Sequence, residues 1–380
     1  MPHQNTVFRD VLKLLPWAGF ERLVEEHDAD ARVRRLTSKD QLVALLYGQL
    51  SGACSLREIV VALSSHGARL YHLGAAPVRR STLSDANAQR PAEVFCGLLE
   101  ILMQQAHRGL RRKLAETVYL IDSTSVGLSA RSADWARFSA GVCGAKTHVI
   151  YDADADQPIY ASVSAANVND ITAAKQMPIE RGATYVFDLG YYDYAWWAAL
   201  DESGCRIVTR FKSNTPLEVM EELKVRKTGN ILSDRIGFLP MRQAKSRRNP
   251  MSSAVREVTV TTETGKVLRI LTNDLDADAQ DIADLYRRRW AIELFFRWVK
   301  QTLKITRFIG VCENAVRIQI AVALIAFLLL RLAQNTQKAV PSLLVFSRLV
   351  RAHLMQRRSI HELLEPPSTP QDHRQMTLAI

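Results

Sequence analysis

The sequence predicts an α/β fold in which a mixed five-stranded sheet follows a helical N-terminal domain and contains a β-rich insertion. Three observations lead to this fold class. The first third of the chain has helical periodicity, short apolar strands begin near residue 117, and helical periodicity returns near residue 277. The 380 residues are 47% hydrophobic and 23% charged, which excludes wholesale disorder. The formal net charge of +11 favours a polyanionic partner, either nucleic acid or an anionic membrane surface.

Residues 1–115 are expected to form a helical DNA-binding domain. Leucines recur at helical spacing over residues 42–50, after a cap that begins at Thr37. A later helical stretch starts with a basic, polar segment, and its Arg79 and Arg80 are candidates for DNA contacts. Short helices joined by tight turns suit a helix-turn-helix-like unit, although any small helical bundle has the same pattern.

Residues 116–210 are expected to form the first part of the core. The five apolar strands are predicted at residues 117–122, 146–151, 159–163, 185–188 and 206–210. One helix is predicted before the fourth strand and another before the fifth. Three strands, a helix, a strand, a helix and a strand form the order of a ribonuclease H-like fold, which has a mixed five-stranded sheet flanked by helices.

This order is interrupted over residues 211–276, a turn-rich stretch that we interpret as a β-rich insertion. Strands predicted at 255–260 and 267–271 would form a hairpin within it. Residues 277–335 would complete the core with one long helix and a last apolar helix. Residues 336–380 are expected to form a C-terminal helical segment with a loose, polar tail.

A membrane location is not expected. The longest apolar run, residues 320–330, falls short of the roughly 20 residues that a spanning helix needs, so it indicates a buried core helix. The N-terminus lacks the pattern of a signal peptide. The five cysteines include no Cys-x-x-Cys pair, which favours reduced thiols. We therefore expect a cytoplasmic protein with no membrane partner.

Three carboxylates lie where an isolated charge is costly. Asp122 and Asp188 end the first and fourth apolar strands, and Glu293 lies inside the long helix. The first and fourth strands are neighbours in the ribonuclease H-like order, so the two aspartates should converge. With Glu293 they would bind two divalent cations, Mg²⁺ or Mn²⁺, because these ions prefer hard oxygen ligands. A single acid at a strand end is more often a cap or an ion-pair partner.

One face of the long helix carries four polar side chains at offsets of 3, 7 and 14 residues, namely Tyr286, Arg289, Glu293 and Lys300. At about 100° per residue they lie within an arc of about 60°. This face would present a carboxylate for metal beside three groups that can hold DNA phosphates. The alternative is a solvated charged face stabilised by pairs such as Glu293 with Arg297.

The same four residues resemble the Y-R-E-K motif of bacterial insertion-sequence DDE transposases, in insertion sequence family four. Asp122 in the segment Tyr-Leu-Ile-Asp-Ser-Thr and Asp188 in Phe-Asp-Leu-Gly-Tyr-Tyr resemble the first and second acids of that family. The resemblance extends over residues 37–335 and includes an insertion between the fifth strand and the glutamate helix.

The resemblance implies a Mg²⁺-dependent transposase in which Asp122, Asp188 and Glu293 bind two Mg²⁺ ions, with Mn²⁺ as a substitute. The enzyme would hydrolyse the element's ends and transfer the freed 3′-hydroxyls into target DNA. Tyr286, Arg289 and Lys300 would hold the end DNA near the cut. The implied partners are double-stranded DNA, both terminal inverted repeats and target, and a second copy of the chain in a DNA-bound homodimer.

The sequence departs from the family at one step. Members of the group can pass through a DNA hairpin, in which a tryptophan of the insertion stacks on a flipped base. No tryptophan lies between Trp197 and Trp290. The hairpin route is therefore not expected here unless Phe238 or another ring replaces that tryptophan.

Other polar residues have simpler interpretations. The aspartates of residues 152–156 alternate like calcium ligands, but a solvated hairpin turn explains them better. Lys146 and His148 lie near the expected site, and a surface strand position is the preferred interpretation of Lys146. Asn169 and Asp170 are candidates for a place near the metals, but helix capping is the preferred interpretation.

Two alternatives remain open at this level. Another two-metal nuclease with the same fold would cut DNA without joining 3′ ends to a target. A non-catalytic DNA-binding protein derived from a transposase would bind DNA without cutting it. The intact set of three acids argues against the second alternative.

Overall fold

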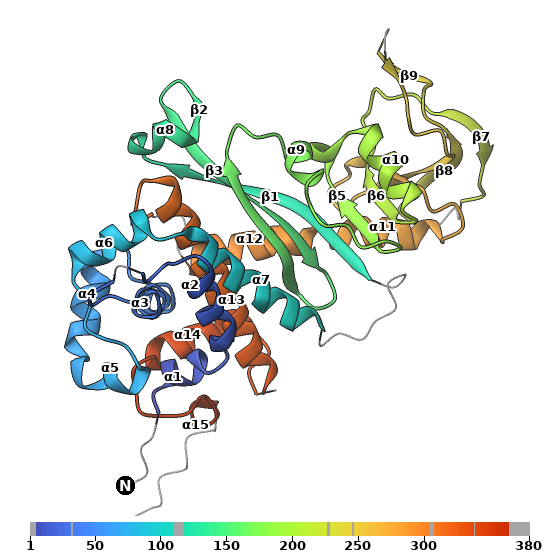
Figure 1. Cartoon of the computed structure of the whole chain (residues 1–380). Coiled ribbons are helices and arrows are strands. Elements are labelled where there is room, and N and C mark those ends of the chain that lie inside the picture. Colours follow the sequence, from blue (N-terminus) through green and yellow to red (C-terminus); the bar gives the residue numbers. More distant parts are fainter. Residues whose placement is uncertain are drawn as a thin grey trace, which may run out of the picture.

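The computed structural model of the chain describes residues 5–31, 33–108, 117–225, 229–244, 247–303, 308–337 and 339–364. Helices from both ends of the chain gather on one side, and the long strands β1 and β3 cross the middle of the molecule (Figure 1). The smaller helices α9 and α10 and the insertion strands lie at the other end (Figure 1). The polar tail predicted after residue 366 lies outside the described residues.

The N-terminal region is helical, as predicted. Its helices are α1 (Val7–Leu12), α2 (Trp17–Glu26), α3 (Ser38–Ser51), α4 (Leu56–Ser65), α5 (Gly67–Leu73), α6 (Arg80–Gln89) and α7 (Ala92–Arg108). The predicted cap before α3 is a capping box, because Thr37 and Asp40 each accept the other's backbone N–H. The helix ends at Gly52, whose φ of 78° is left-handed and suits glycine.

The five predicted strands are present and lie in the predicted order. They are β1 (Val118–Leu128), β3 (Val142–Asp152), β4 (Gln157–Ala165), β5 (Thr184–Phe187) and β6 (Arg206–Arg210). Side by side they run β4, β3, β1, β5, β6. The pairs of β3 with β1 and with β4 are antiparallel, whereas β1 with β5 and β5 with β6 are parallel. A short strand, β2 (Arg137–Ser139), pairs with the start of β3.

The sheet does not end at its fifth strand, which corrects the expectation of a five-stranded sheet. The larger insertion strands are β7 (Glu218–Glu222), β8 (Ile231–Phe238), β11 (Val255–Thr261) and β12 (Val267–Thr272). β12 pairs with β6, so that ten strands form one sheet within the described residues. This pairing satisfies backbone groups that an exposed β6 edge would leave open. Strands β9 (Arg242–Ala244) and β10 (Arg247–Arg248) form a separate pair.

The central strands of the sheet are buried on both faces, in two hydrophobic cores. Along β1, Leu120 belongs to the core that also contains the N-terminal helices, whereas Tyr119 and Ile121 belong to the other core. The alternation of strand side chains explains this division. The second core includes the residues of α9 (Asp170–Ala174), the 3₁₀ helix η3 (Leu189–Tyr191) and α10 (Tyr194–Glu202). Trp197 is fully buried there.

The long helix predicted from residue 277 is divided in two. A single residue, Arg289, separates helix α11 (Ala279–Arg288) from helix α12 (Trp290–Thr302). At the junction, the Arg289 N–H donates to the carbonyl of Tyr286 at 3.2 Å, one residue nearer than in an α-helix. Glu293 therefore lies in the first turn of a new helix, and its relation to Tyr286 follows from the junction and not from one straight axis.

The last apolar helix, α13 (Glu313–Asn335), is a core helix, as predicted. It is long and apolar enough to cross a membrane, but 83% of its most apolar window is buried inside the protein. It packs against α3 and α7 and against α14 (Leu343–His353), so one core joins the N-terminal helices to the C-terminal part of the chain. Helix α15 (Ile360–Leu364) follows. None of the five cysteines, all of them described, is in a disulfide.

The turn between β3 and β4 is less solvated than predicted. Asp152 is only 1% exposed, and its carboxylate accepts the backbone N–H groups of Asp154 and Ala155. Asp154 pairs with Arg288 at the end of α11, and Asp156 pairs with Arg331 of α13 at 2.6 Å. The alternating aspartates therefore attach the turn to two helices.

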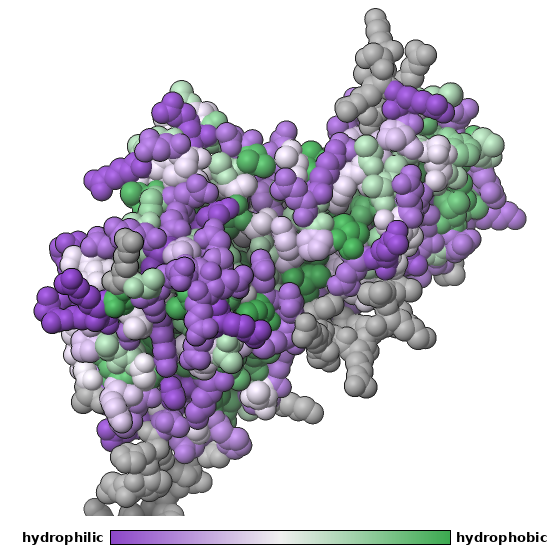
Figure 2. Space-filling model, viewed as in Figure 1, coloured by the Kyte–Doolittle hydropathy of each residue, from purple (hydrophilic) through white to green (hydrophobic). Residues whose placement is uncertain are grey.

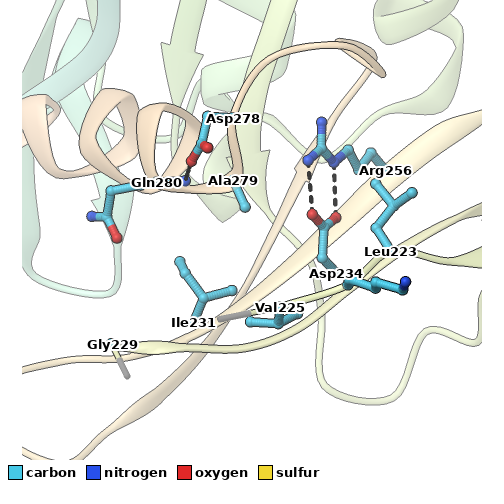
Figure 3. A pocket seen from close by; sticks show the side chains of 10 residues that line it. Leu223, Val225, Gly229, Ile231, Asp234, Arg256, Asp278, Ala279 and Gln280 are labelled. Atoms are coloured by element: carbon cyan, nitrogen blue, oxygen red, sulfur yellow. Dashed lines mark hydrogen bonds and ion pairs between the residues drawn. The ribbon is translucent and has the colours of Figure 1, made fainter. Parts of the chain in front are cut away.

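A buried ion pair joins the insertion to the start of α11. Arg256 on β11 and Asp234 on β8 form two hydrogen bonds, at 2.8 and 2.7 Å, with side chains only 5% and 4% exposed (Figure 3). Arg256 also donates to the carbonyls of Leu275 and Ala277, at 3.1 and 2.6 Å. One guanidinium thus links two insertion strands to the loop that leads into α11.

Candidate active site

The two strand aspartates directly follow a pair of residues that lie opposite each other on the neighbouring strands β1 and β5. Parallel pairing of β1 with β5 places Ile121 opposite Phe187, and Asp122 and Asp188 are the next residues along each chain. Both strands are apolar and buried up to these positions. Asp188 follows the end of β5, as predicted, but β1 continues to Leu128, paired with β3, so the prediction that Asp122 ends its strand is wrong. The Ser123 N–H donates to Asp122 Oδ1 at 2.7 Å, and the Gly190 N–H donates to Asp188 Oδ1 at 2.8 Å. Local backbone donors thus orient both carboxylates.

Glu293 is connected to this pair through Arg289. Arg289 Nη2 lies 2.6 Å from Glu293 Oε1, and Arg289 Nη1 lies 3.8 Å from Asp122 Oδ2. The side chains of Arg289 and Asp122 are each 17% exposed, so the guanidinium bridges the two carboxylates in a largely enclosed position. The compact junction between α11 and α12 puts Arg289 at this point.

The pKa of Asp122 reflects the proximity of all three acids. Burial, and after it the negative charges of Asp188 and Glu293, raise the pKa of Asp122 to about 7. The Ser123 N–H and the Arg289 guanidinium act in the opposite direction. The three carboxylates predicted from the sequence therefore gather in one electrostatic neighbourhood.

The other residues of the predicted helix face also reach this neighbourhood. The Arg289 guanidinium lies 5.7 Å from the centroid of the Tyr286 ring. Burial lowers the pKa of Lys300, and the charge of Asp122 opposes that effect, so the ammonium is close enough to interact with Asp122. Arg210, at the end of β6, also interacts electrostatically with the Tyr286 hydroxyl, which the sequence did not indicate.

Arg79 and Arg80 lie apart from this group. They are exposed at the start of α6, in the helical N-terminal region, where Arg79 is the N-cap and Arg80 the first helical residue. Figure 2 shows a largely hydrophilic face over the N-terminal helices, with more hydrophobic surface toward the insertion. Phe238 is 37% exposed at the end of β8, paired with Glu218 of the edge strand β7.

The chemistry of the acids suits divalent cations, although their present arrangement does not form a finished site. Among the described residues, no three acidic, histidine or cysteine side chains lie close enough together to hold one metal ion. A cationic group, the Arg289 guanidinium, instead stands between Asp122 and Glu293. The two carboxylates repel each other, and a positive charge between them offsets this repulsion. The Arg289 guanidinium therefore occupies a position that suits a cation.

A fourth carboxylate, Asp170, for which the sequence favoured helix capping over a place near the metals, lies beside the strand aspartates. Asn169 precedes α9 but makes no side-chain cap, so the capping interpretation is wrong for Asn169. Asp170 Oδ1 instead accepts the Ser123 hydroxyl at 2.7 Å and the Lys146 ammonium at 3.1 Å. Lys146 is therefore not a surface residue, since its side chain is only 15% exposed. His148 is fully buried and bonded to Ser164 at 2.8 Å.

Tyr191 completes this cluster. Its side chain is 1% exposed, and no hydrogen bond of normal geometry joins its hydroxyl to another described residue. Burial, and after it the charges of Asp122, Asp170 and Asp188, raise the pKa of the Tyr191 hydroxyl. The charges of three carboxylates thus act on this buried phenol. The weak signal for it in the sequence is its position three residues after Asp188.

Comparison with known proteins relates this chain to transposases. Residues 113–329 match the family described as "Transposase DDE domain", and residues 3–76 match a domain of unknown function, DUF4372. The chain is 39% identical to a Sinorhizobium fredii protein named as a transposase, y4zB, over 77% of this chain and 82% of that protein. It is 30% identical to a Geobacillus stearothermophilus protein named as a transposase for insertion sequence element IS5377, over 75% and 76%.

Among solved structures, a piggyBac transposase synaptic complex with hairpin DNA aligns with a TM-score of 0.45 at 10% identity. That alignment covers 96% of this chain and 81% of the other. A similarity of this size does not by itself establish a common fold.

Proposed function

Because this chain belongs to the Transposase DDE domain family and is an insertion-sequence transposase, we propose that Asp122, Asp188 and Glu293 form its catalytic centre. The observation that carries this proposal is the register of β1 and β5, which puts the two aspartates next to each other. Arg289 connects Glu293 to the same place. The strand order β4, β3, β1, β5, β6 supports a ribonuclease H-like core.

The three acids would hold two Mg²⁺ ions, for which Mn²⁺ could substitute. Their carboxylate oxygens match the ligand preference of these ions, and the Arg289 guanidinium stands near them where a cation is favoured. When bound, the ions supply activation of the attacking oxygen and stabilisation of the leaving oxygen in phosphodiester chemistry. The protein's part is to hold the carboxylates in position, and the Ser123 and Gly190 N–H groups do this for the aspartates.

Tyr286, Arg289 and Lys300 would hold the end DNA beside the acids. A guanidinium, an ammonium and a phenol can each donate to phosphate oxygens. Arg79 and Arg80, exposed on the N-terminal helices, would extend the contact along the duplex. We expect a homodimer on DNA, since two element ends must be brought together, and a cytoplasmic location.

The reaction is tested with purified full-length protein, Mg²⁺ and DNA that carries the inverted repeats flanking its gene. We expect cuts at the repeat ends, followed by joining of the 3′ ends to a supercoiled target plasmid. Both products should disappear when EDTA removes the metal. Cutting without joining would identify a nuclease of another kind, and binding without cutting would identify a non-catalytic derivative.

Lys300→Ala is expected to weaken binding of end DNA. If the Lys300 ammonium contacts a phosphate, its loss should make the slope of log K against log salt concentration less steep by about 1. Binding titrations at several salt concentrations, in the absence of Mg²⁺, measure this slope. Lys175→Ala is the matched control, because the Lys175 ammonium is paired with Asp193 at 2.9 Å. Equal slopes for wild type and Lys300→Ala would contradict the phosphate contact.

A further inference from the structure

Asp170 contacts the segments that orient both strand aspartates. Its Oδ1 accepts the hydroxyl of Ser123 at 2.7 Å, and the backbone N–H of the same serine donates to Asp122 at 2.7 Å. Asp170 therefore holds the side chain of Ser123, and the backbone N–H of Ser123 in turn orients the carboxylate of Asp122.

The contact with the second aspartate passes through Gly190. A Cβ atom added to Gly190 would lie 3.0 Å from Asp188 Oδ1 and 3.4 Å from Asp170 Oδ2. The turn that follows β5 therefore packs between the two carboxylates, and only a residue without a side chain fits there unstrained. Asp170 thus lies against the turn whose backbone N–H holds Asp188.

Lys146 keeps Asp170 in this position and balances its charge. The Lys146 ammonium donates to Asp170 at 3.1 Å and to the carbonyl of Val168 at 2.9 Å, so it anchors both the carboxylate and the loop before α9. An unpaired fourth carboxylate would repel Asp122 and Asp188. Paired with Lys146, Asp170 can support them without adding net negative charge.

Two observations favour a supporting role over a place among the metal ligands. Oδ1 of Asp170 already accepts two hydrogen bonds, and its partner Lys146 is largely buried. The hydroxyl of Tyr191 is buried and has no hydrogen bond of normal geometry among the described residues, and it is close enough to the same acids to feel their charge. A buried polar group of this kind suits a site that is completed when ions and their water ligands enter.

We infer that Asp170 is a positioning residue, held by Lys146, that sets the spacing of Asp122 and Asp188 through Ser123 and the Gly190 turn. This inference rests on the proposed catalytic role of the two strand aspartates. Groups that orient metal ligands typically change metal affinity by about 10- to 100-fold when they are removed.

The test is Asp170→Asn in the full-length chain, with Mn²⁺ alone as the first probe. Calorimetric titration should give about 10- to 100-fold weaker Mn²⁺ binding than wild type. The Mg²⁺ concentration for half-maximal end cleavage should rise by a similar factor, while cleavage at saturating Mg²⁺ recovers most of the wild-type rate. Ser123→Ala removes only the connection to Asp122, so it should cause a smaller change in the same direction.

Asp193→Asn is the matched control. Asp193 and Asp170 have the same side-chain exposure, 25%, and each is paired with a lysine, but Asp193 pairs with Lys175. The control should bind Mn²⁺ as wild type does, and all the variants should unfold at similar temperatures.

Wild-type Mn²⁺ affinity in Asp170→Asn would overturn the inference. Loss of cleavage at every Mg²⁺ concentration would also overturn it, because Asp170 would then behave as a ligand. A fall in affinity that only follows a lower unfolding temperature would reduce its role to stability. If wild type itself neither binds Mn²⁺ nor cuts DNA, the proposed function fails first, and the variants are not needed to show it.

Discussion

Asp188→Asn is expected to reduce cleavage of end DNA by at least about 1,000-fold, because loss of a group that acts in the chemical step costs several orders of magnitude. The amide keeps the shape of the side chain and can still accept the Gly190 N–H, so the turn after β5 should survive. It removes the negative charge that the proposed metal ions require. Single-turnover cleavage rates at saturating Mg²⁺ measure the effect.

DNA binding separates this effect from misfolding. Mobility-shift titrations without Mg²⁺ should give Asp188→Asn at least the affinity of wild type, since a negative charge near the phosphates has been removed. Asp193→Asn, five residues further along and paired with Lys175, should cleave at the wild-type rate. Equal cleavage by Asp188→Asn and wild type would refute the assignment of the second acid.

Arg256→Met is expected to lower the free energy of unfolding by about 3–5 kcal/mol, because it leaves the buried carboxylate of Asp234 without its partner. The two side chains are only 5% and 4% exposed, so water cannot replace the lost guanidinium (Figure 3). Urea unfolding followed by circular dichroism measures the change. End cleavage should also fall, since Arg256 holds the loop before α11, the helix that contains Tyr286.

A double variant tests the physical reason. Asp234→Leu combined with Arg256→Met removes both charges and should recover most of the lost stability, because an apolar pair of similar volume often replaces a buried ion pair without cost. The lost donors to the Leu275 and Ala277 carbonyls should prevent full recovery.

A more exposed ion pair, with one partner at 40% and the other at 11% exposure, gives the comparison. Arg206 pairs with Asp274 at 2.7 Å, but its side chain is 40% exposed. Arg206→Met should therefore cost less than about 1 kcal/mol. A similar loss of stability in Arg206→Met and Arg256→Met would mean that burial does not determine how much each ion pair contributes to the free energy of unfolding.

The strands could be predicted because their signal is local. An apolar run such as residues 118–121 has few stable alternatives to a buried strand, and the order of strands and helices limits how they can pair. The extension of the sheet by the insertion could not be predicted in the same way. Pairing of β12 with β6 depends on which strand edge of the folded sheet is left unpaired, and no short sequence pattern indicates that edge.

The site was predictable to the extent that its residues are spaced along one element or end a strand. Asp188, after β5, and Arg289, Glu293 and Lys300, along α12 and its cap, met that condition. Asp122 lies inside β1, and Tyr286 lies on the separate helix α11. Asp170 did not meet the condition, because its position at a helix start has a simpler explanation as a cap, and Lys146 is 24 residues away in the chain. The break between α11 and α12 at Arg289 could not be predicted either, because no glycine or proline lies there.

By itself, the sequence predicted a mixed α/β fold with a helical N-terminal region, three candidate acids and, from the net charge of +11, a polyanionic partner. These features follow from apolar periodicity and residue type, which are properties of short segments. Only the tertiary structure showed that Arg289 stands between Asp122 and Glu293, and that Asp170 bonds to Ser123 and lies beside the Gly190 turn. Such contacts depend on distances between charges, and folding alone brings residues from separate elements within that range.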